Sequence, residues 1–157
     1  MRSLLLLAAW GVAAGTKAPP NILVLFVDDL GYADTGFSNG TQSTPNVDRL
    51  AKEGLVFNMW YSGASVCTPS RAALVTGRLA VRSGLAGQST MSSAMSTGCV
   101  GGLPANETTL GEALKTVGFD TKLIGKWHLG QRDTFLPTNN GYDEFFGLPQ
   151  SVDSGCR

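Results

Sequence analysis

A chain of 157 residues with 43% hydrophobic and 15% charged residues has the composition of an ordinary globular protein, long enough to build one domain around a core. This composition excludes an intrinsically disordered polymer. Twelve basic residues balance twelve acidic ones, and no cluster of lysines and arginines marks a nucleic-acid-binding surface. We therefore expect a folded domain with no nucleic-acid partner.

The N-terminal segment has the layout of a signal peptide. Arg2 supplies a short basic region, residues 4–12 are mostly apolar, and small residues follow up to Gly15. We expect residues 1–15 to be removed, which leaves no membrane span, because the apolar run is too short to cross a bilayer. A buried first helix is the alternative. Two sequons, at Asn39 and Asn106, fit glycosylation in the secretory pathway.

The first apolar run after this segment ends in two carboxylates. Residues 21–27 are continuously apolar after Asn21, which is typical of a strand buried on both faces of a parallel sheet. Asp28 and Asp29 follow at its C-terminal end, where open α/β sheets place ligands. Adjacent carboxylates repel one another unless a cation neutralises them, so the pair is suited to calcium or magnesium. A polar turn with Asp29 as a cap is the alternative.

Farther along the chain, helical and strand patterns alternate. Helix signals span residues 44–53 and 109–117, and strand composition is found at residues 55–61 and 121–124. Thr109 and Glu112 form a capping-box pattern at the start of the second helix. Residues 83–102 are rich in small residues without a period, which predicts a long loop. The alternation predicts an α/β fold.

The stretch Cys67-Thr68-Pro69-Ser70-Arg71 places a thiol at the start of a predicted helix. The alanines and leucine that follow favour helix up to Thr76, and Pro69 is tolerated in a first helical turn. Exposed N–H groups, the helix dipole and Arg71 all favour negative charge there. We therefore expect anion chemistry at Cys67. A buried free thiol that packs as a small hydrophobe is the alternative.

Residues 65–71, with Leu74-Val75-Thr76-Gly77, resemble the signature of the sulfatase family residue for residue. The resemblance implies that a formylglycine-generating enzyme converts Cys67 to formylglycine, whose hydrate attacks the sulfur of a sulfate ester, with Arg71 supporting its hydroxyls. It implies that Asp28 and Asp29 share one calcium ion with this residue. It also implies an alkaline-phosphatase-like mixed sheet flanked by helices.

Residues 118–128 are similar to the second signature of the family, with Phe119 where tyrosine or valine is usual. The resemblance implies that Lys126 contacts the sulfate oxygens and the hydrated aldehyde. It implies that His128, the only histidine in the chain, orients the nucleophilic hydroxyl or transfers a proton. Because these residues are two apart, both can face one side of an extended loop. A solvent-facing or structural pair is the alternative.

Further motifs within residues 101–110 and 136–149 resemble the arylsulfatase A and G subgroup. Ser151 falls where that subgroup has a serine near the substrate, although Val152 replaces the histidine expected next. The later calcium ligands, distal histidine and distal lysine of the family have no counterpart. We therefore expect residues 16–157 to be the N-terminal part of a sulfatase domain, truncated and inactive by itself.

The leading hypothesis is an arylsulfatase-type sulfuric ester hydrolase that acts on a sulfated small molecule, lipid or glycan, in the lysosome or outside the cell. An inactive sulfatase-like fragment is one alternative. A phosphohydrolase of the same wider fold is another, disfavoured because that branch has serine or threonine in place of Cys67. Three cysteines cannot all pair within the chain, and Cys156 needs a partner in Cys99 or elsewhere.

Overall fold

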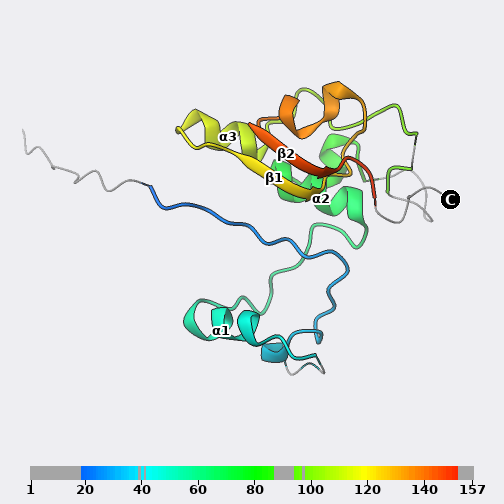
Figure 1. Cartoon of the computed structure of the whole chain (residues 1–157). Helices are drawn as coiled ribbons and strands as arrows, with labels where there is room; N and C mark the ends of the chain where they lie inside the picture. Colours follow the sequence, from blue (N-terminus) through cyan, green and yellow to red (C-terminus); the bar gives the residue numbers. More distant parts are fainter. Residues whose placement is uncertain (1–18, 39, 41, 87–93, 97, 152–157) are drawn as a thin grey trace, which may run out of the picture. The chain divides into compact units, whose positions relative to one another are not determined.

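The computed structural model describes residues 19–38, 40, 42–86, 94–96 and 98–151 (Figure 1). The chain divides into two compact units, Met1–Gly31 and Tyr32–Arg157. The expected signal peptide, the sequon at Asn39 and Cys156 lie outside the described residues. Within the described ranges, no helix is long and apolar enough to cross a membrane.

The regular elements that the structure describes all lie in the second unit. They are the helices α1 (Pro45–Glu53), α2 (Cys67–Thr76) and α3 (Leu110–Thr116), the strands β1 (Lys122–Lys126) and β2 (Glu144–Leu148), and the 3-10 turns η1 (Gly36–Ser38), η2 (Ala80–Ser83), η3 (Asp133–Phe135) and η4 (Pro137–Asn139). The three predicted helices and the strand predicted near residues 121–124 are confirmed. Strand β2 was not predicted.

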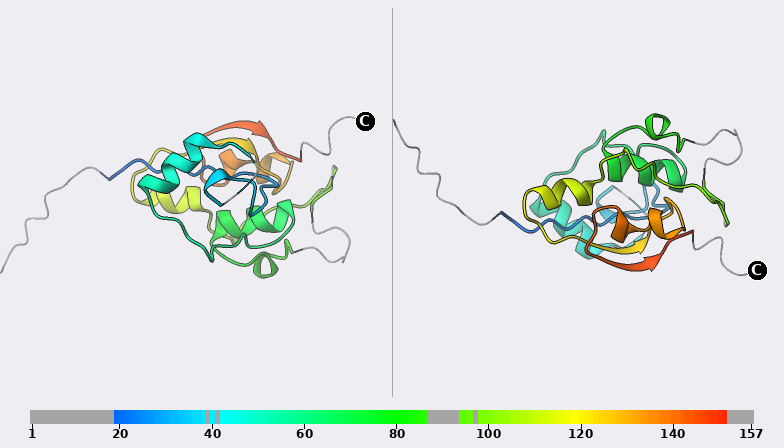
Figure 2. Two further views of the ribbon diagram at one scale, coloured as in Figure 1. Left: turned by 90° about the horizontal axis from the view of Figure 1, so that it is seen from below. Right: turned by 90° about the horizontal axis from the view of Figure 1, so that it is seen from above.

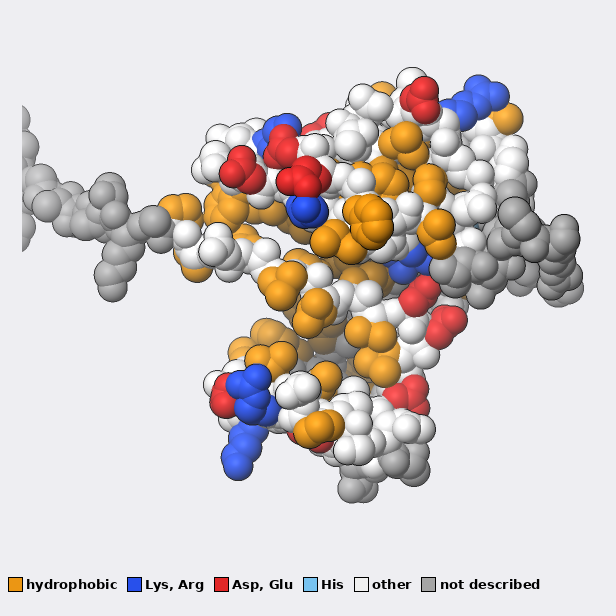
Figure 3. Space-filling view, in the orientation of Figure 1, with side chains coloured by type: hydrophobic (Ala, Val, Ile, Leu, Met, Phe, Trp, Pro, Cys, Tyr) orange, Lys and Arg blue, Asp and Glu red, His pale blue; other side chains and the backbone are white. Residues whose placement is uncertain are grey.

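The strands β1 and β2 pair in parallel, from Lys122 opposite Glu144 to Lys126 opposite Leu148. Both views in Figure 2 show α2 and α3 on one side of this pair. On the opposite face, Ile124 and Phe146 are 70% and 76% exposed, and Figure 3 shows hydrophobic side chains gathered at this surface. The α/β class is confirmed. The described sheet is a parallel pair, whereas a mixed sheet was expected.

Two of the predicted strands are wrong. Residues 21–27 form no strand, and their apolar side chains are exposed, from 40% at Phe26 to 82% at Leu23. Residues 55–61 form no strand either, and Trp60 is 78% exposed. A strand depends on hydrogen bonds to a neighbouring strand, and the sheet in the described residues contains β1 and β2 alone. An apolar run by itself therefore did not determine a strand.

The hydrophobic core of the second unit is small and lies around the segment that leaves β1. Its buried apolar members are Ala72, Val75, Ala80, Leu103, Trp127 and Leu129. Trp127 Nε1 donates a hydrogen bond to the Phe135 carbonyl at 2.7 Å, and the Trp127 ring meets Tyr142 edge-on with 6.0 Å between ring centroids. Burial raises the pKa of the Tyr142 hydroxyl. Core packing thus fixes both residues that flank His128.

Helix α3 has the capping box that its sequence predicts. Thr109 Oγ1 accepts a hydrogen bond from the Glu112 N–H at 3.0 Å, and Glu112 Oε2 accepts one from the Thr109 N–H at 2.8 Å. The Thr109 hydroxyl also donates to the Asn140 carbonyl at 2.7 Å, which ties α3 to the chain ahead of β2. The described residues between 84 and 101 contain no helix or strand, as the predicted loop requires.

Candidate active site

Helix α2 begins at Cys67, so the thiol lies at the helix N-terminus as predicted. Val66 precedes it in an extended conformation, with φ −128° and ψ 150°. Cys67 is half-buried and its thiol is free, whereas Thr68 is 1% exposed. The helix ends at Gly77, whose φ of 64° suits a residue without a Cβ. The partly accessible thiol therefore meets the positive end of the helix dipole.

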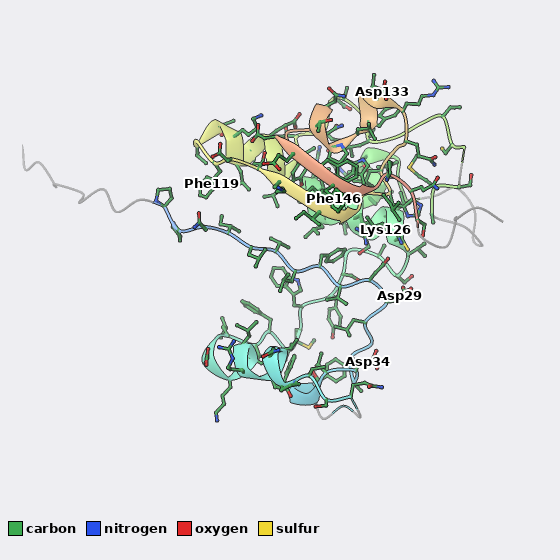
Figure 4. The ribbon with its side chains drawn as sticks, in the orientation of Figure 1. Asp29, Asp34, Phe119, Lys126, Asp133 and Phe146 are labelled. Carbon is green, nitrogen blue, oxygen red and sulfur yellow. The ribbon has the colours of Figure 1, made fainter. Side chains whose placement is uncertain are left out.

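Arg71, one turn after Cys67, connects α2 to the end of β1. Its Nη1 donates a hydrogen bond to the backbone carbonyl of Lys126 at 2.5 Å. Lys126 is the last residue of β1 and is half-buried (Figure 4). Residues four apart share one face of a helix, so Arg71 lies on the same side of α2 as Cys67. The structure thus brings together residues of both predicted signatures.

Two predicted site residues have an unusual backbone conformation. Among the described non-glycine residues, Asp29 and His128 alone have a positive φ, of 54° and 60°. Such conformations cost energy, persist where the surroundings enforce them and are frequent at functional sites. At His128 the neighbouring strand helps to enforce it, because the His128 N–H donates to the Pro149 carbonyl at 2.9 Å. The left-handed turn also means that strand alternation does not determine where the ring points.

The imidazole of His128 is buried, with the residue 3% exposed. Its Nε2 lies 2.8 Å from the backbone carbonyl of Met95. The His128 carbonyl in turn accepts a hydrogen bond from the Thr68 hydroxyl at 3.2 Å. The sequence analysis missed both partners. Thr68 lies inside the first signature, but no local pattern in the sequence connects Met95 to His128.

Asp28 and Asp29 belong to the first unit and are both exposed at a turn. Their carboxylates are hard oxygen donors, which are the ligands that calcium prefers. Among the described residues, no group of three or more His, Cys, Asp or Glu side chains could hold a metal ion. The two residues therefore fit part of a calcium site, since calcium takes about six to eight oxygen ligands.

The other predicted residues differ in accessibility. Ser151 is 4% exposed, so a substrate contact there has to reach a buried hydroxyl. Asn106 is exposed, as a glycosylation site requires, while the adjacent Glu107 is buried and pairs with Arg78 at 3.1 Å. Cys99 carries a free, half-buried thiol.

Comparison with known proteins identifies the family. The family model described as Sulfatase matches residues 20–154. N-acetylgalactosamine-6-sulfatase of Canis lupus familiaris is 46% identical over 152 residues, which cover 94% of this chain and 29% of the relative. Arylsulfatase A of Bos taurus is 47% identical over 156 residues, which cover 98% of this chain and 29% of the relative.

Solved structures agree with this result. The PsFucS1 sulfatase from Pseudoalteromonas sp. has a TM-score of 0.73 and 45% identity, over 85% of this chain and 26% of that one. Ps i-CgsB in complex with k-i-k-neocarrahexaose has a TM-score of 0.67 and 37% identity, over 76% of this chain and 26% of that one. The chain therefore belongs to the sulfatase family. It spans 29% of the length of each of the two relatives.

Proposed function

We propose that this chain supplies the nucleophile of an arylsulfatase-type sulfuric ester hydrolase. One observation carries the proposal: Cys67 is the first residue of α2, and Arg71, one turn later, donates a hydrogen bond to the carbonyl of Lys126. The half-buried Cys67 thus begins α2, and the Arg71 guanidinium of the same helix contacts Lys126, the last residue of β1. Membership of the sulfatase family supports conversion of Cys67 to formylglycine by a formylglycine-generating enzyme.

A hydrated aldehyde at Cys67 suits sulfate ester cleavage. One hydroxyl attacks sulfur and displaces the alcohol, and the other then collapses to the carbonyl, which expels sulfate without a second attack at sulfur. In the proposed mechanism, Lys126 neutralises charge on the nonbridging sulfate oxygens and Arg71 supports the formylglycine hydroxyls. His128 orients the attacking hydroxyl or transfers its proton. Ser151 is the proposed further contact to substrate.

The proposed cofactor is one calcium ion held by Asp28, Asp29 and the formylglycine. When bound, a divalent cation neutralises charge on the sulfate oxygens. The exposed carboxylates supply the oxygen chemistry that such an ion needs. Binding of calcium is a property that can be measured separately from turnover.

The names of the relatives support a sulfated substrate. One relative is named for a sulfated amino sugar, and one solved structure holds an oligosaccharide, k-i-k-neocarrahexaose. We therefore propose a sulfated glycan as the leading substrate class, with sulfated lipids and small molecules as the others. We also propose an alkaline-phosphatase-like fold, glycosylation at Asn39 and Asn106, and a lysosomal or extracellular location.

The test combines modification with turnover. The 157-residue chain by itself is expected to be inactive, so the test uses a complete sulfatase domain that contains this chain. This protein is secreted from cells that contain the converting enzyme, and mass spectrometry of the peptide around Cys67 measures formylglycine. Hydrolysis of an aryl sulfate and of an aryl phosphate is then compared for the wild type, Cys67→Ala and the control Cys99→Ser. We expect formylglycine at Cys67 and sulfate hydrolysis that only Cys67→Ala abolishes. An unmodified thiol on every copy, while a known sulfatase is converted in the same cells, rejects the proposal. Modification without sulfate hydrolysis supports the inactive alternative, and preference for the phosphate supports a phosphohydrolase.

A further inference from the structure

Three segments that are distant in sequence form a closed ring of hydrogen bonds at His128. The Thr68 hydroxyl donates to the His128 carbonyl at 3.2 Å. The same Oγ1 accepts from the Met95 N–H at 2.9 Å, and the Met95 carbonyl lies 2.8 Å from His128 Nε2. We infer that Thr68 is a positioning residue, whose hydroxyl fixes the ring orientation and tautomer of His128 through Met95.

The ring of contacts determines which imidazole nitrogen carries the proton. A backbone carbonyl oxygen can only accept a hydrogen bond, so Nε2 of His128 must donate to Met95. In neutral imidazole one nitrogen is protonated and the other holds a lone pair. Nδ1 is therefore the nitrogen that accepts or returns a proton during any reaction at this site. The positioning of His128 is inferred from these contacts alone. Only the catalytic use of the proton rests on the proposed function.

The Thr68 hydroxyl is unusual for its position. A threonine inside a helix often bonds to a backbone carbonyl three or four residues earlier in the chain. Thr68 is 1% exposed, and its hydroxyl bonds to backbone groups 60 residues and 27 residues away. It serves as donor and acceptor at once, and both partners are backbone groups at a buried place. A methyl group of the same size can make neither bond, so Thr68→Val removes the closed ring of hydrogen bonds while it keeps the packing.

A second contact holds the Met95 segment without touching His128. Gln131 Nε2 donates to the Ser96 carbonyl at 3.2 Å on the exposed side. Thr76, on the same helix as Thr68, donates from Oγ1 to the Ala72 carbonyl at 2.7 Å within the helix. Gln131→Ala and Thr76→Val therefore remove side-chain hydrogen bonds nearby while they leave the ring of contacts intact, and they are matched controls.

Nuclear magnetic resonance tests the inference without turnover, because the 157-residue chain has a single histidine. At about pH 8, where an ordinary imidazole is neutral, the ¹⁵N shifts of Nδ1 and Nε2 distinguish the two tautomers. We expect the Nε2–H tautomer in the wild type, Thr68→Ser, Thr76→Val and Gln131→Ala. In Thr68→Val we expect a mixture of tautomers, and about a five- to tenfold faster exchange of the Met95 amide, as for the loss of one hydrogen bond.

An Nδ1–H tautomer in the wild type, or an unchanged tautomer and Met95 exchange in a folded Thr68→Val, overturns the inference. If Thr68→Val does not fold, Thr68→Ser decides alone: retention of both signals supports the role of the hydroxyl, and loss of either in a folded variant rejects it. Neither readout depends on formylglycine or sulfate hydrolysis. Failure of the proposed function therefore leaves this result standing, and the reverse is equally true.

Discussion

Arg71 and Lys126 are joined by a hydrogen bond of 2.5 Å between the guanidinium Nη1 and the backbone carbonyl. The two residues lie 55 positions apart, one in the N-terminal half of α2 and one at the end of β1. The guanidinium therefore stabilises the fold around the site as well as offering charge to it. A planar group with five donors can serve two partners, whereas an ammonium on a flexible stem cannot reproduce that geometry.

Replacing Arg71 by lysine should therefore affect both stability and activity. We expect Arg71→Lys to lower the free energy of unfolding by about 1–3 kcal/mol, the range for a hydrogen bond with a charged donor. In a complete sulfatase domain that contains this chain, turnover of an aryl sulfate should fall at least about tenfold, as for loss of a preorganised charge-stabilising group. Urea unfolding followed by tryptophan fluorescence measures the first effect. Arg49→Lys is the control, because Arg49 makes an exposed ion pair with Glu53; an equal loss in both variants contradicts the prediction.

The exposed apolar segment of the first unit gives a second prediction. Leu25 is 73% exposed and Leu129 is 0% exposed. Leu25→Ser should change the free energy of unfolding by no more than about 0.5 kcal/mol, as for surface substitutions, while Leu129→Ala should cost about 2–5 kcal/mol. Chemical denaturation of both variants measures the difference. A loss at Leu25 that matches the loss at Leu129 means that this segment is a buried strand after all.

Local signals were enough for the helices, and they failed where structure depends on distant partners. The capping box at Thr109 and the glycine after α2 are interactions within a few residues, so the sequence alone indicates them. Residues 21–27 have the composition of a buried strand, but a strand requires a partner that composition does not reveal. Strand β2 was missed for the same reason, because its pairing with β1 joins segments about twenty residues apart.

The site shows the same division. The family motifs identified Cys67, Arg71, Lys126 and His128, and the structure places Arg71 on the Lys126 carbonyl. The contact between Met95 and His128 could not be predicted from the sequence, since the two residues are 33 positions apart and α3 and β1 lie between them. The left-handed backbone of His128 was not predicted either, because a positive φ is uncommon for any non-glycine residue, although histidine adopts it more often than most. Motifs thus predicted the candidate site residues, and tertiary contacts determine how these residues are held.

Metal binding gives a third prediction. Asp28→Asn and Asp29→Asn should each lower bound calcium per chain and turnover together, because each removes one carboxylate from the proposed site. Asparagine tolerates the left-handed conformation of Asp29, so the variant does not add backbone strain. Calcium content after gel filtration and aryl sulfate hydrolysis are measured on a complete sulfatase domain that contains this chain. Asp120→Asn, another exposed carboxylate, is the control. Variants that keep both calcium and turnover identify the pair as a polar turn.

The pairing of β1 with β2 depends on a glycine. A Cβ at Gly147 meets the Gly125 carbonyl oxygen at 1.8 Å, so alanine there must displace one strand from the other. We expect Gly147→Ala to cost about 1–3 kcal/mol or more in the free energy of unfolding, as for overpacked sites. Gly101→Ala is the matched control, because a Cβ there has no neighbour within 4 Å. Thermal unfolding of the two variants measures the difference, and equal melting temperatures contradict the described pairing.

The last prediction concerns acid and the carboxylate of Asp143. It accepts hydrogen bonds from Lys115 Nζ at 2.6 Å and from the Thr121 N–H and hydroxyl at 2.9 Å. Together these contacts lower the pKa of Asp143 from 3.8 to about 2. Because the pKa is lower in the folded state, the stabilisation is present above the unfolded pKa and is lost as pH falls through the folded one.

The urea midpoint of the wild type should therefore exceed that of Asp143→Asn by a constant amount above about pH 5, and the difference should shrink as the pH falls from about 4 to about 2. Lys115→Met should raise the pKa of Asp143 and move this loss to higher pH. Asp120→Asn, an exposed carboxylate elsewhere in the second unit, is the control. A difference between the wild type and Asp143→Asn that stays constant down to about pH 2 shows that the contacts of Asp143 do not favour its charged form.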